Sequence, residues 1–532
     1  MTDSQVWDAG AMEARSMEAR SMEARSMEAR ALEARVLEAR APEDGVMEAE
    51  ATESGAGTAG REAPGRARGA RGRVLAVLIP STGGLLFGYG TGGIAGVLPL
   101  IGEQYGLSAW TQGVVVSAAL LGAALTAPVS GRLTDRFGRR PVIAAAAAAF
   151  AVGTAVSAAA GGPAALVLGR FLVGLALGAI SFAVPLYIAE IAPPARRGAL
   201  VTLNQLMITI GLLLAYAVSY ALQSDGAWRL MLAAGLAPAL VLLVGMAGVP
   251  ESPSWLESAG HRARARAAAA ALGLPPAPEQ PAIVGPQSDG PQGGGPQVGG
   301  PQGGGRPGGG RRGGGRRGGG AGFREALAEA GPRRVALGLG IAVLVHLTGL
   351  NTAIYYAPTI LAASGLTPSG GVLGAVLVGV CNVAATVVTI ALLDRGGRRP
   401  LMLGGLAAMA AAAAGIAATQ WSGGHAGTTA LLLCGFIVAG AVGPAPVFWV
   451  FAAEIYPRRA RGALMSLATA AHWAADFVVA ATFLPLVKAL SLGGAFALYG
   501  AVTLAAALGL ARWMPETKGI SLDDTRAEPV RV

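Results

Sequence analysis

The chain has 532 residues, of which 53% are hydrophobic and only 14% charged, and its formal net charge is +10. Soluble globular chains carry about a quarter charged residues, so this composition argues against a soluble protein and indicates one with several membrane spans. The two cysteines, Cys381 and Cys434, lie in apolar runs and form neither a zinc-ligand spacing nor a disulfide framework.

Residues 1–73 are polar and contain no short apolar signal core, so we expect the first apolar run to act as an uncleaved insertion signal. Residues 12–40 repeat the pentad "MEARS" with small variations. Each pentad advances a helix by about 500°, so no continuous apolar face forms. The pattern predicts a disordered or fraying arm, which either binds a partner or is an extension without function.

From Val74 onward the chain alternates long apolar stretches with short polar connections. A bilayer core of about 30 Å needs about 20 apolar residues in a helix. Twelve stretches meet this requirement: 74–98, 109–130, 141–160, 163–187, 199–222, 228–249, 335–362, 370–393, 400–420, 427–452, 463–487 and 492–513. The sequence therefore predicts an all-α polytopic membrane protein with a first six-helix bundle at 74–256 and a second at 335–514.

A polar insert at 257–334 separates the two bundles, and a tail at 515–532 follows the second. The insert begins alanine- and arginine-rich and becomes Gly/Pro-rich, a composition that cannot bury a core. Its arginines could attract RNA or anionic lipid, but a flexible tether between the halves is the simpler interpretation. We expect no nucleic-acid partner.

Positive charges gather in alternate connections between the apolar stretches, with Lys488 as the exception. By the positive-inside rule, this bias predicts that both termini and the insert lie in the cytoplasm. The expected location is the plasma membrane, where the lipid bilayer surrounds the spans.

Two charged motifs occur once in each half of the chain. Asp-Arg-x-Gly-Arg-Arg begins at Asp135 and again at Asp394, after the second span of each half. Glu-x6-Arg-Gly begins at Glu190 and again at Glu454, after the fourth span. Two parallel halves suit a transporter that rocks about a site near the middle of the membrane.

These motifs, in this order, resemble the major facilitator superfamily, and further stretches resemble its sugar porter family. The stretches are "GGLLFGYGTGGIAG", "GRFLVG", "PESPSWL", "GLNTAIYYAP", "GPAPVFWVFAAEIYP" and "PETKG", and the resemblance covers residues 74–520. It implies twelve helices in two six-helix halves. The implied activity is alternating-access transport of a sugar or polyol by a monomer, with no enzymatic reaction, cofactor or metal.

The resemblance also assigns roles to residues. It implies a gating role for the charged turns and for a tyrosine pair: Asp135, Arg136, Arg139, Glu190, Arg197, Tyr355, Tyr356, Asp394, Arg395, Arg398, Glu454 and Arg461. It implies sugar contacts for Gln205, Asn351, Asn382, Trp449 and Trp473. Independently, ionisable residues inside spans are candidates for function, and these are Arg170, His346, His472 and Asp476.

The chain departs from the sugar porter pattern at three places. Gly90 stands where proton-coupled members carry an aspartate, Val345-His346 replaces a glutamine pair, and His472 and Asp476 stand where the family has asparagines. The first departure leaves Arg170 without its expected partner and favours facilitated uniport. The alternative is proton symport with Asp476 or His346 as carrier, because a buried carboxylate can hold a proton at neutral pH.

The substrate stays open at this point. A glucose-like hexose or a pentose is the first expectation, followed by a polyol or a charged metabolite; a cation would suit Asp476 beside Trp473. A membrane sugar sensor and a drug exporter are the rival functions. An enzyme is disfavoured, since the sequence has no nucleophile elbow, metal-ligand spacing or phosphate-binding loop.

Overall fold

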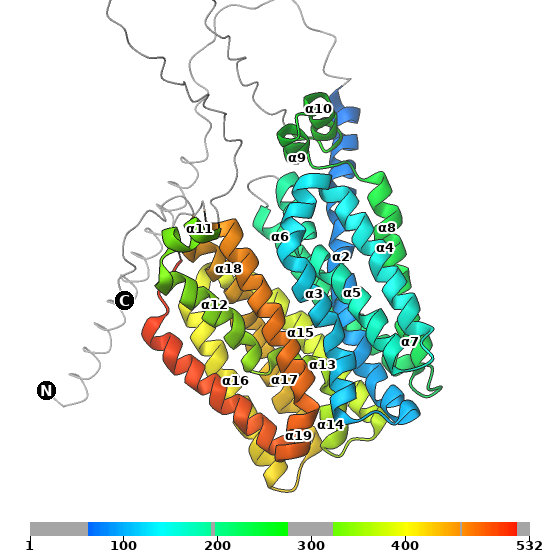
Figure 1. Cartoon of the computed structure of the whole chain (residues 1–532), viewed down its shortest axis with the longest axis vertical. Coiled ribbons are helices and arrows are strands. Elements are labelled where there is room, and N and C mark those ends of the chain that lie inside the picture. The colour runs from blue at the N-terminus through cyan, green and yellow to red at the C-terminus, as the bar shows by residue number, and fades with distance from the viewer. Residues whose placement is uncertain (1–61, 193–196, 275–322, 458–459, 519–532) are drawn as a thin grey trace, which may run out of the picture. The chain divides into compact units, whose positions relative to one another are not determined.

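The computed structural model describes residues 62–192, 197–274, 323–457 and 460–518, and every regular element among them is a helix (Figure 1). The described residues from Pro64 onward belong to one compact unit, to which the description below applies. The pentad repeat, the Gly/Pro-rich middle of the insert and most of the C-terminal tail lie outside the described residues.

The first half contains six spans, the last of them made of two short helices in succession. Its elements are α2 (Glu62–Tyr105), α3 (Ala109–Phe137), α4 (Arg139–Ala158), α5 (Pro163–Ile191), α6 (Arg197–Leu222), α7 (Trp228–Ala233) and α8 (Leu236–Gly248), followed by α9 (Pro253–Ser258) and α10 (Arg262–Ala271) outside the spans.

The second half repeats this plan with more interruptions. Its elements are α11 (Phe323–Ala330), α12 (Pro332–Leu347), α13 (Leu350–Tyr355), α14 (Ala357–Ala363), α15 (Pro368–Gly396), α16 (Arg398–Trp421), α17 (Ala426–Val442), α18 (Pro444–Ile455) and α19 (Arg461–Trp513).

Eleven helical segments among the described residues are long and apolar enough to cross a membrane. The last, α19, has 53 residues and contains Ser491 with a non-helical φ of 66°. This break falls between the eleventh and twelfth predicted stretches, so α19 supplies two spans and the prediction of twelve is met.

The predicted linker is helical at both of its ends. At its start, α10 buries Ala265 and Ala268 against Leu256 of α9. At its end, α11 buries Ala326 and Ala330 against the core of the second half. The expectation of a flexible tether is therefore wrong for these two segments, because their alanines are spaced to form a buried helical face.

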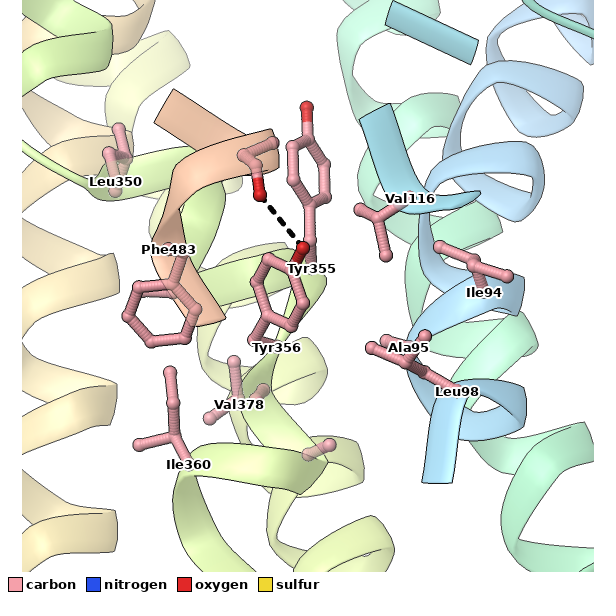
Figure 2. Close-up of a cluster of buried hydrophobic side chains, with 14 of the residues drawn as sticks. Ile94, Ala95, Leu98, Val116, Leu350, Tyr355, Tyr356, Ile360, Val378 and Phe483 are labelled. Atoms are coloured by element: carbon pink, nitrogen blue, oxygen red, sulfur yellow. Dashed lines mark hydrogen bonds between the residues drawn. The ribbon is translucent and has the colours of Figure 1, made fainter. Parts of the chain in front are cut away.

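Three hydrophobic clusters show where the two halves meet. The largest contains residues of both halves, including Ile94 and Val116 of the first and Tyr356 and Phe483 of the second (Figure 2). The other two clusters each lie within one half, and they pack the helix ends near Gly138 and Gly397, which we call the basic end. The halves are thus joined away from the basic end and keep separate cores beside it.

Candidate transport site and gate networks

The charged turn of the first half joins α3 to α4 through the single residue Gly138. Its φ is 97°, in a region that favours glycine. Arg139, the next residue, holds Glu190 of α5 with two nitrogens: Nη2 lies 2.8 Å from Oε1 and Nε lies 3.0 Å from Oε2. Its Nη1 lies 3.2 Å from Oδ1 of Asp135. One guanidinium therefore fixes the ends of three helices.

Glu251, directly after α8, closes the same network from the other side. Its carboxylate accepts hydrogen bonds from the backbone N–H groups of Arg139, Arg140 and Ser252. The first N–H groups of a helix have no acceptor within the helix, so this carboxylate caps α4. A Cβ on Gly138 would collide with the Glu251 carboxylate, a second reason for glycine there.

The second half repeats this arrangement. Nη2 of Arg398 lies 2.8 Å from Oε1 of Glu454, and Gly397 before it has a φ of 78°. Glu516 takes the place of Glu251 and accepts from the backbone N–H groups of Arg398 and Arg399. Partial burial acts to raise the pKa of Glu516, but four backbone N–H donors outweigh it and lower that pKa below its ordinary value.

The other predicted gating residues lie outside these two ion pairs or outside the described side chains. Arg136 and Arg395 are exposed, and the guanidinium of Arg136 lies over the Phe137 ring. Nε of Arg461 donates to the Tyr456 carbonyl at 3.4 Å. The side chains of Arg197 and Asp394 lie outside the described part of the structure.

Among the described residues, the ion pairs formed by Arg139 and Arg398 stay inside their own half. Arg139 pairs with Asp135 and Glu190 in the first half, and Arg398 pairs with Glu454 in the second. In this conformation the pairs brace each bundle rather than bridge the two. A lock between the halves at the basic end therefore stays a prediction for another conformation.

A buried polar cluster lies in the middle of the second half, centred on Asp476 of α19, which is 1% exposed. Its Oδ2 accepts from the Tyr355 hydroxyl at 2.6 Å and from Nδ2 of Asn351 at 3.0 Å. Its Oδ1 lies 3.1 Å from Nδ1 of His346, within ion-pair distance but without hydrogen-bond alignment. Four predicted site residues, from α12, α13 and α19, thus meet at one carboxylate.

Aromatic rings surround this cluster. His472 is their common member, with ring centroids 4.0 to 5.4 Å from those of His346, Trp449, Phe448 and Trp473. Trp473 in turn lies 5.5 Å from Phe87 of the first half. Trp449 is 37% exposed and Trp473 is buried. The rings therefore run from the polar cluster to the boundary between the halves.

Arg170 of α5 approaches this boundary from the first half. Its Nη1 donates to the Gly90 carbonyl at 2.7 Å, so the backbone supplies an acceptor where the sequence leaves no carboxylate. A small cavity brings Arg170 together with Tyr355 and Trp473, and its other lining residues include Phe87. The cavity thus connects the buried guanidinium with the polar cluster.

Several buried polar atoms at this place have no hydrogen-bond partner among the described residues. They are Nε of Arg170, Nε2 of His346, Nδ1 of His472, Nε1 of Trp473 and Oδ1 of Asp476. Buried polar groups in folded proteins are nearly always satisfied, so such a concentration indicates a place where water or a polar ligand binds. The set includes both donors and acceptors, as a polyhydroxyl ligand requires.

Comparison with known proteins identifies the family. Residues 76–284 and 318–528 match the family described as "Sugar (and other) transporter". The chain belongs to this family. It is 36% identical to the putative metabolite transport protein YwtG of Bacillus subtilis (strain 168), over 83% of this chain and 92% of that protein.

Further relatives and solved structures agree. The galactose-proton symporter of Escherichia coli (strain K12) is 36% identical over 83% of this chain and 90% of its own length. The partially occluded inward open conformation of the xylose transporter XylE from E. coli superposes with a TM-score of 0.67 at 26% identity, covering 84% of this chain and 99% of that one.

Within this sugar transporter family member, three predicted site residues do not join the polar cluster. Gln205 is exposed on α6, and Asn382 is buried on α15; neither hydrogen-bonds to the cluster within the described residues. The Tyr356 hydroxyl donates to the Ala480 carbonyl at 2.8 Å, and its ring packs on Phe483 (Figure 2). These contacts are within the second half, and Tyr356 belongs to the hydrophobic cluster that joins the halves.

Sequence reasoning missed several functional positions. Glu251 and Glu516 stand inside the quoted motifs "PESPSWL" and "PETKG", and their equivalent places in the two halves could have marked them as helix caps. Phe87 and Phe448 also stand inside quoted motifs, but an apolar aromatic residue inside a span is indistinguishable from core packing.

Proposed function

We propose that this transporter moves a hexose, a pentose or a similar polyol across the plasma membrane by alternating access, as a monomer with both termini in the cytoplasm. The observation that carries the proposal is the group of unpartnered buried polar atoms beside Trp473 and Asp476. Hydroxyl groups both donate and accept, so one sugar could satisfy several of these atoms. Family membership and the names of relatives that carry galactose, glucose and xylose support the same substrate class.

The conformation fits one stage of such a cycle. Placing the basic end in the cytoplasm follows from the positive-inside rule. The halves then adhere on the outer side, where the Tyr216 hydroxyl of the first donates to the Ile354 carbonyl of the second at 2.6 Å. Their separate cores at the basic end leave room for opening toward the cytoplasm, so we interpret the structure as inward-facing.

Within this proposal, Trp473 supplies the apolar platform for a sugar ring and one N–H donor, and Asn351 supplies an amide. Gln205 and Asn382 stay proposed sugar contacts, and both lie on the helices α6 and α15 that pack together across the two halves. A sugar bound between the halves would therefore meet groups from both.

The test is counterflow of labelled D-xylose, D-glucose, D-galactose and myo-inositol in proteoliposomes, with Trp473→Phe as the key variant. This change keeps an aromatic ring but removes the buried indole N–H. Loss of one ligand hydrogen bond costs about 0.5–1.5 kcal/mol, so the half-saturation concentration should rise roughly two- to tenfold.

The matched control is Trp110→Phe, at an exposed tryptophan near the start of α3, which should leave transport unchanged. Absence of counterflow with all four solutes refutes the transport proposal. A Trp473→Phe variant that behaves like Trp110→Phe refutes the placement of the sugar.

A further inference from the structure

The structure contains a buried ionisable pair in the second half of the chain, far in sequence from span one. His346 of α12 and Asp476 of α19 have side chains that are each 1% exposed, with Nδ1 and Oδ1 3.1 Å apart. No other His–carboxylate pair occurs among the described residues. Gly90 offers only its carbonyl to Arg170, and residues 74–98 of span one include no Asp or Glu that could alternate with this pair.

We propose that the His346–Asp476 pair binds the proton that this transporter moves together with its sugar. Asn351 and Tyr355 link that proton to the contact between the halves on the outer side, the Tyr216–Ile354 hydrogen bond, which we call the outer gate. The proposal rests on the proposed sugar transport and replaces the uniport that Gly90 alone favours. It assigns a second transported species to the chain and a place where that species binds.

Charge balance makes one proton the natural load of the pair. Without it, a carboxylate faces a neutral imidazole and has no cation within ion-pair distance among the described residues, so its charge is compensated only at longer range by Arg170, which is costly away from water. With one proton, the pair is neutral, whichever of the two groups holds it. A closed site should therefore retain the proton, and a site opened to water should release it.

The titratable and polar groups around the pair set this balance. His346 of α12 and Asn351 and Tyr355 of α13 contact Asp476, and the His472 ring packs on His346. Arg170 of α5 lines the small cavity that Tyr355 also lines. Arg170 is the only one that carries a fixed positive charge, and it belongs to the other half. Movement of the halves changes its distance from the pair and hence the pair's hold on the proton.

The connection to the gate runs through α13, a helix of six residues set off by breaks on both sides. Gly349 before it has a φ of 79°, and Tyr356 after it departs from helical geometry. Asn351 and Tyr355 of α13 both donate to Oδ2 of Asp476, while the Ile354 carbonyl accepts from Tyr216 of the first half. One short helix is therefore held by the carboxylate on one side and by the opposite half on the other.

Protonation of Asp476 changes what it can offer to α13. The carboxylate only accepts hydrogen bonds, whereas the carboxylic acid also donates one. The two donors from α13 bind the charged form more strongly. In each cycle, one proton from external water binds the pair as sugar binds, α13 and the halves rearrange, and the same proton leaves to cytoplasmic water with the sugar. No bond other than those to the proton is made or broken.

The experiment measures three quantities in proteoliposomes with D-xylose, D-glucose, D-galactose or myo-inositol, whichever shows counterflow. They are counterflow, sugar-driven alkalinisation of the external medium, and accumulation under an imposed pH gradient. With one proton per sugar, a gradient of one pH unit limits accumulation to about tenfold. Wild type should alkalinise the medium and accumulate sugar. Asp476→Asn should do neither, while still giving measurable, slower counterflow.

The matched control is Asp225→Asn, at an exposed aspartate in the loop before α7, which should keep accumulation and alkalinisation. Wild-type counterflow without proton movement overturns the inference and leaves sugar transport intact. Coupled accumulation that persists in Asp476→Asn overturns it too. Absence of any counterflow in wild type removes the proposed function and this inference together.

A second variant decides the outcome if Asp476→Asn gives no counterflow. Tyr355→Phe keeps the carboxylate but removes one of its donors, so the charged form loses support and the pH profile of accumulation should shift to higher pH. Tyr220→Phe, at an exposed tyrosine of α6, is the control. A Tyr355→Phe profile that coincides with wild type overturns the inference, since a purely structural tyrosine would alter rates without moving the profile.

Discussion

Replacing Gly113 with alanine should shift the transporter away from the conformation seen here. Gly113 lies on α3 where this helix crosses α19, and a Cβ there would strike the carbonyl oxygen of Ala481. The same Cβ would lie 3.1 Å from the carbonyl carbon and 3.4 Å from Cα of Ala481. Backbone atoms cannot rotate away as a side chain can, so the two helices must separate.

The size of the effect follows from the cost of overpacking, about 1–3 kcal/mol for an added methyl group in a close contact. This cost falls only on conformations in which α3 and α19 touch at Gly113. A factor of ten in population corresponds to 1.4 kcal/mol. The population should therefore move roughly five- to 150-fold toward conformations in which the outer contact is open.

Spin labels on cysteines at Glu257 of α9 and Glu329 of α11 would report the change, in a background lacking Cys381 and Cys434. Both glutamates are exposed and lie on helices near the basic end, one attached to each half. Distances measured by pulsed electron resonance should shorten in Gly113→Ala as the basic ends approach each other.

The control for this experiment is Gly435→Ala in α17, where a Cβ would have no atom within 4 Å. Both variants gain the same small helix propensity from alanine, about 0.5–1 kcal/mol. If Gly113→Ala gives the same distance distribution as Gly435→Ala, the α3–α19 contact does not hold the conformation and the reasoning fails.

Three further predictions follow from the charged turns and from the break in span seven. Glu516→Gln should lower the melting temperature at neutral pH. Because the pKa of Glu516 is lowered in the folded state, this difference from wild type should shrink as the pH falls below 4.5 and through that lowered pKa. A series of thermal-shift measurements at different pH values tests this. Glu190→Gln should destabilise the protein by about 1–2 kcal/mol, because it takes a carboxylate away from the mostly buried Arg139 guanidinium. Asp225→Asn, at an exposed aspartate that accepts from the Ser224 hydroxyl, should leave the melting temperature unchanged. Gly349→Ala should abolish counterflow, since its Cβ would lie 2.5 Å from the Tyr499 ring, whereas Gly331→Ala, with a similar positive φ but open space around it, should only lower the melting temperature.

The membrane architecture could be predicted from the sequence because it depends on local composition. Each span is a run of apolar residues long enough to cross the bilayer, and the twelve predicted stretches correspond to the helices found. The prediction was wrong at α10 and α11, where alanine-rich segments pack on neighbouring helices. The composition of these segments, averaged over all their residues, is polar and gives no sign of the apolar face.

The site was predictable residue by residue but not as an arrangement. The sequence marks His346 and Asp476 as ionisable groups inside spans, whereas only the resemblance to sugar porters marks Asn351 and Tyr355. Their convergence on one carboxylate depends on the break at Gly349, which turns α13 toward α19. Such geometry is tertiary, and no local pattern encodes it.

Arg170 illustrates the same limit from the opposite direction. The sequence shows a guanidinium in span four whose expected carboxylate partner in span one is replaced by Gly90, and it cannot say what satisfies the charge. In the structure the acceptor is the backbone carbonyl of that same glycine. A side chain at position 90 would also press against Phe150, 3.0 Å from an ideal Cβ. The lost carboxylate and the retained arginine are therefore compatible within one packed site.

The two halves are alike at the charged turns of the basic end and differ in the middle, where the site is proposed. Arg139 with Glu190 and Arg398 with Glu454 form the same bidentate pair at the same place in each bundle. The centre shows no such repetition, because the second half contributes the polar cluster around Asp476 and the first contributes a lone guanidinium. Matching braces let each bundle move as a solid body. In the proposed mechanism, movement of Arg170 relative to the Asp476 cluster changes the binding of a proton. Proton-coupled alternating access uses both properties, and the duplicated motifs supply only the first.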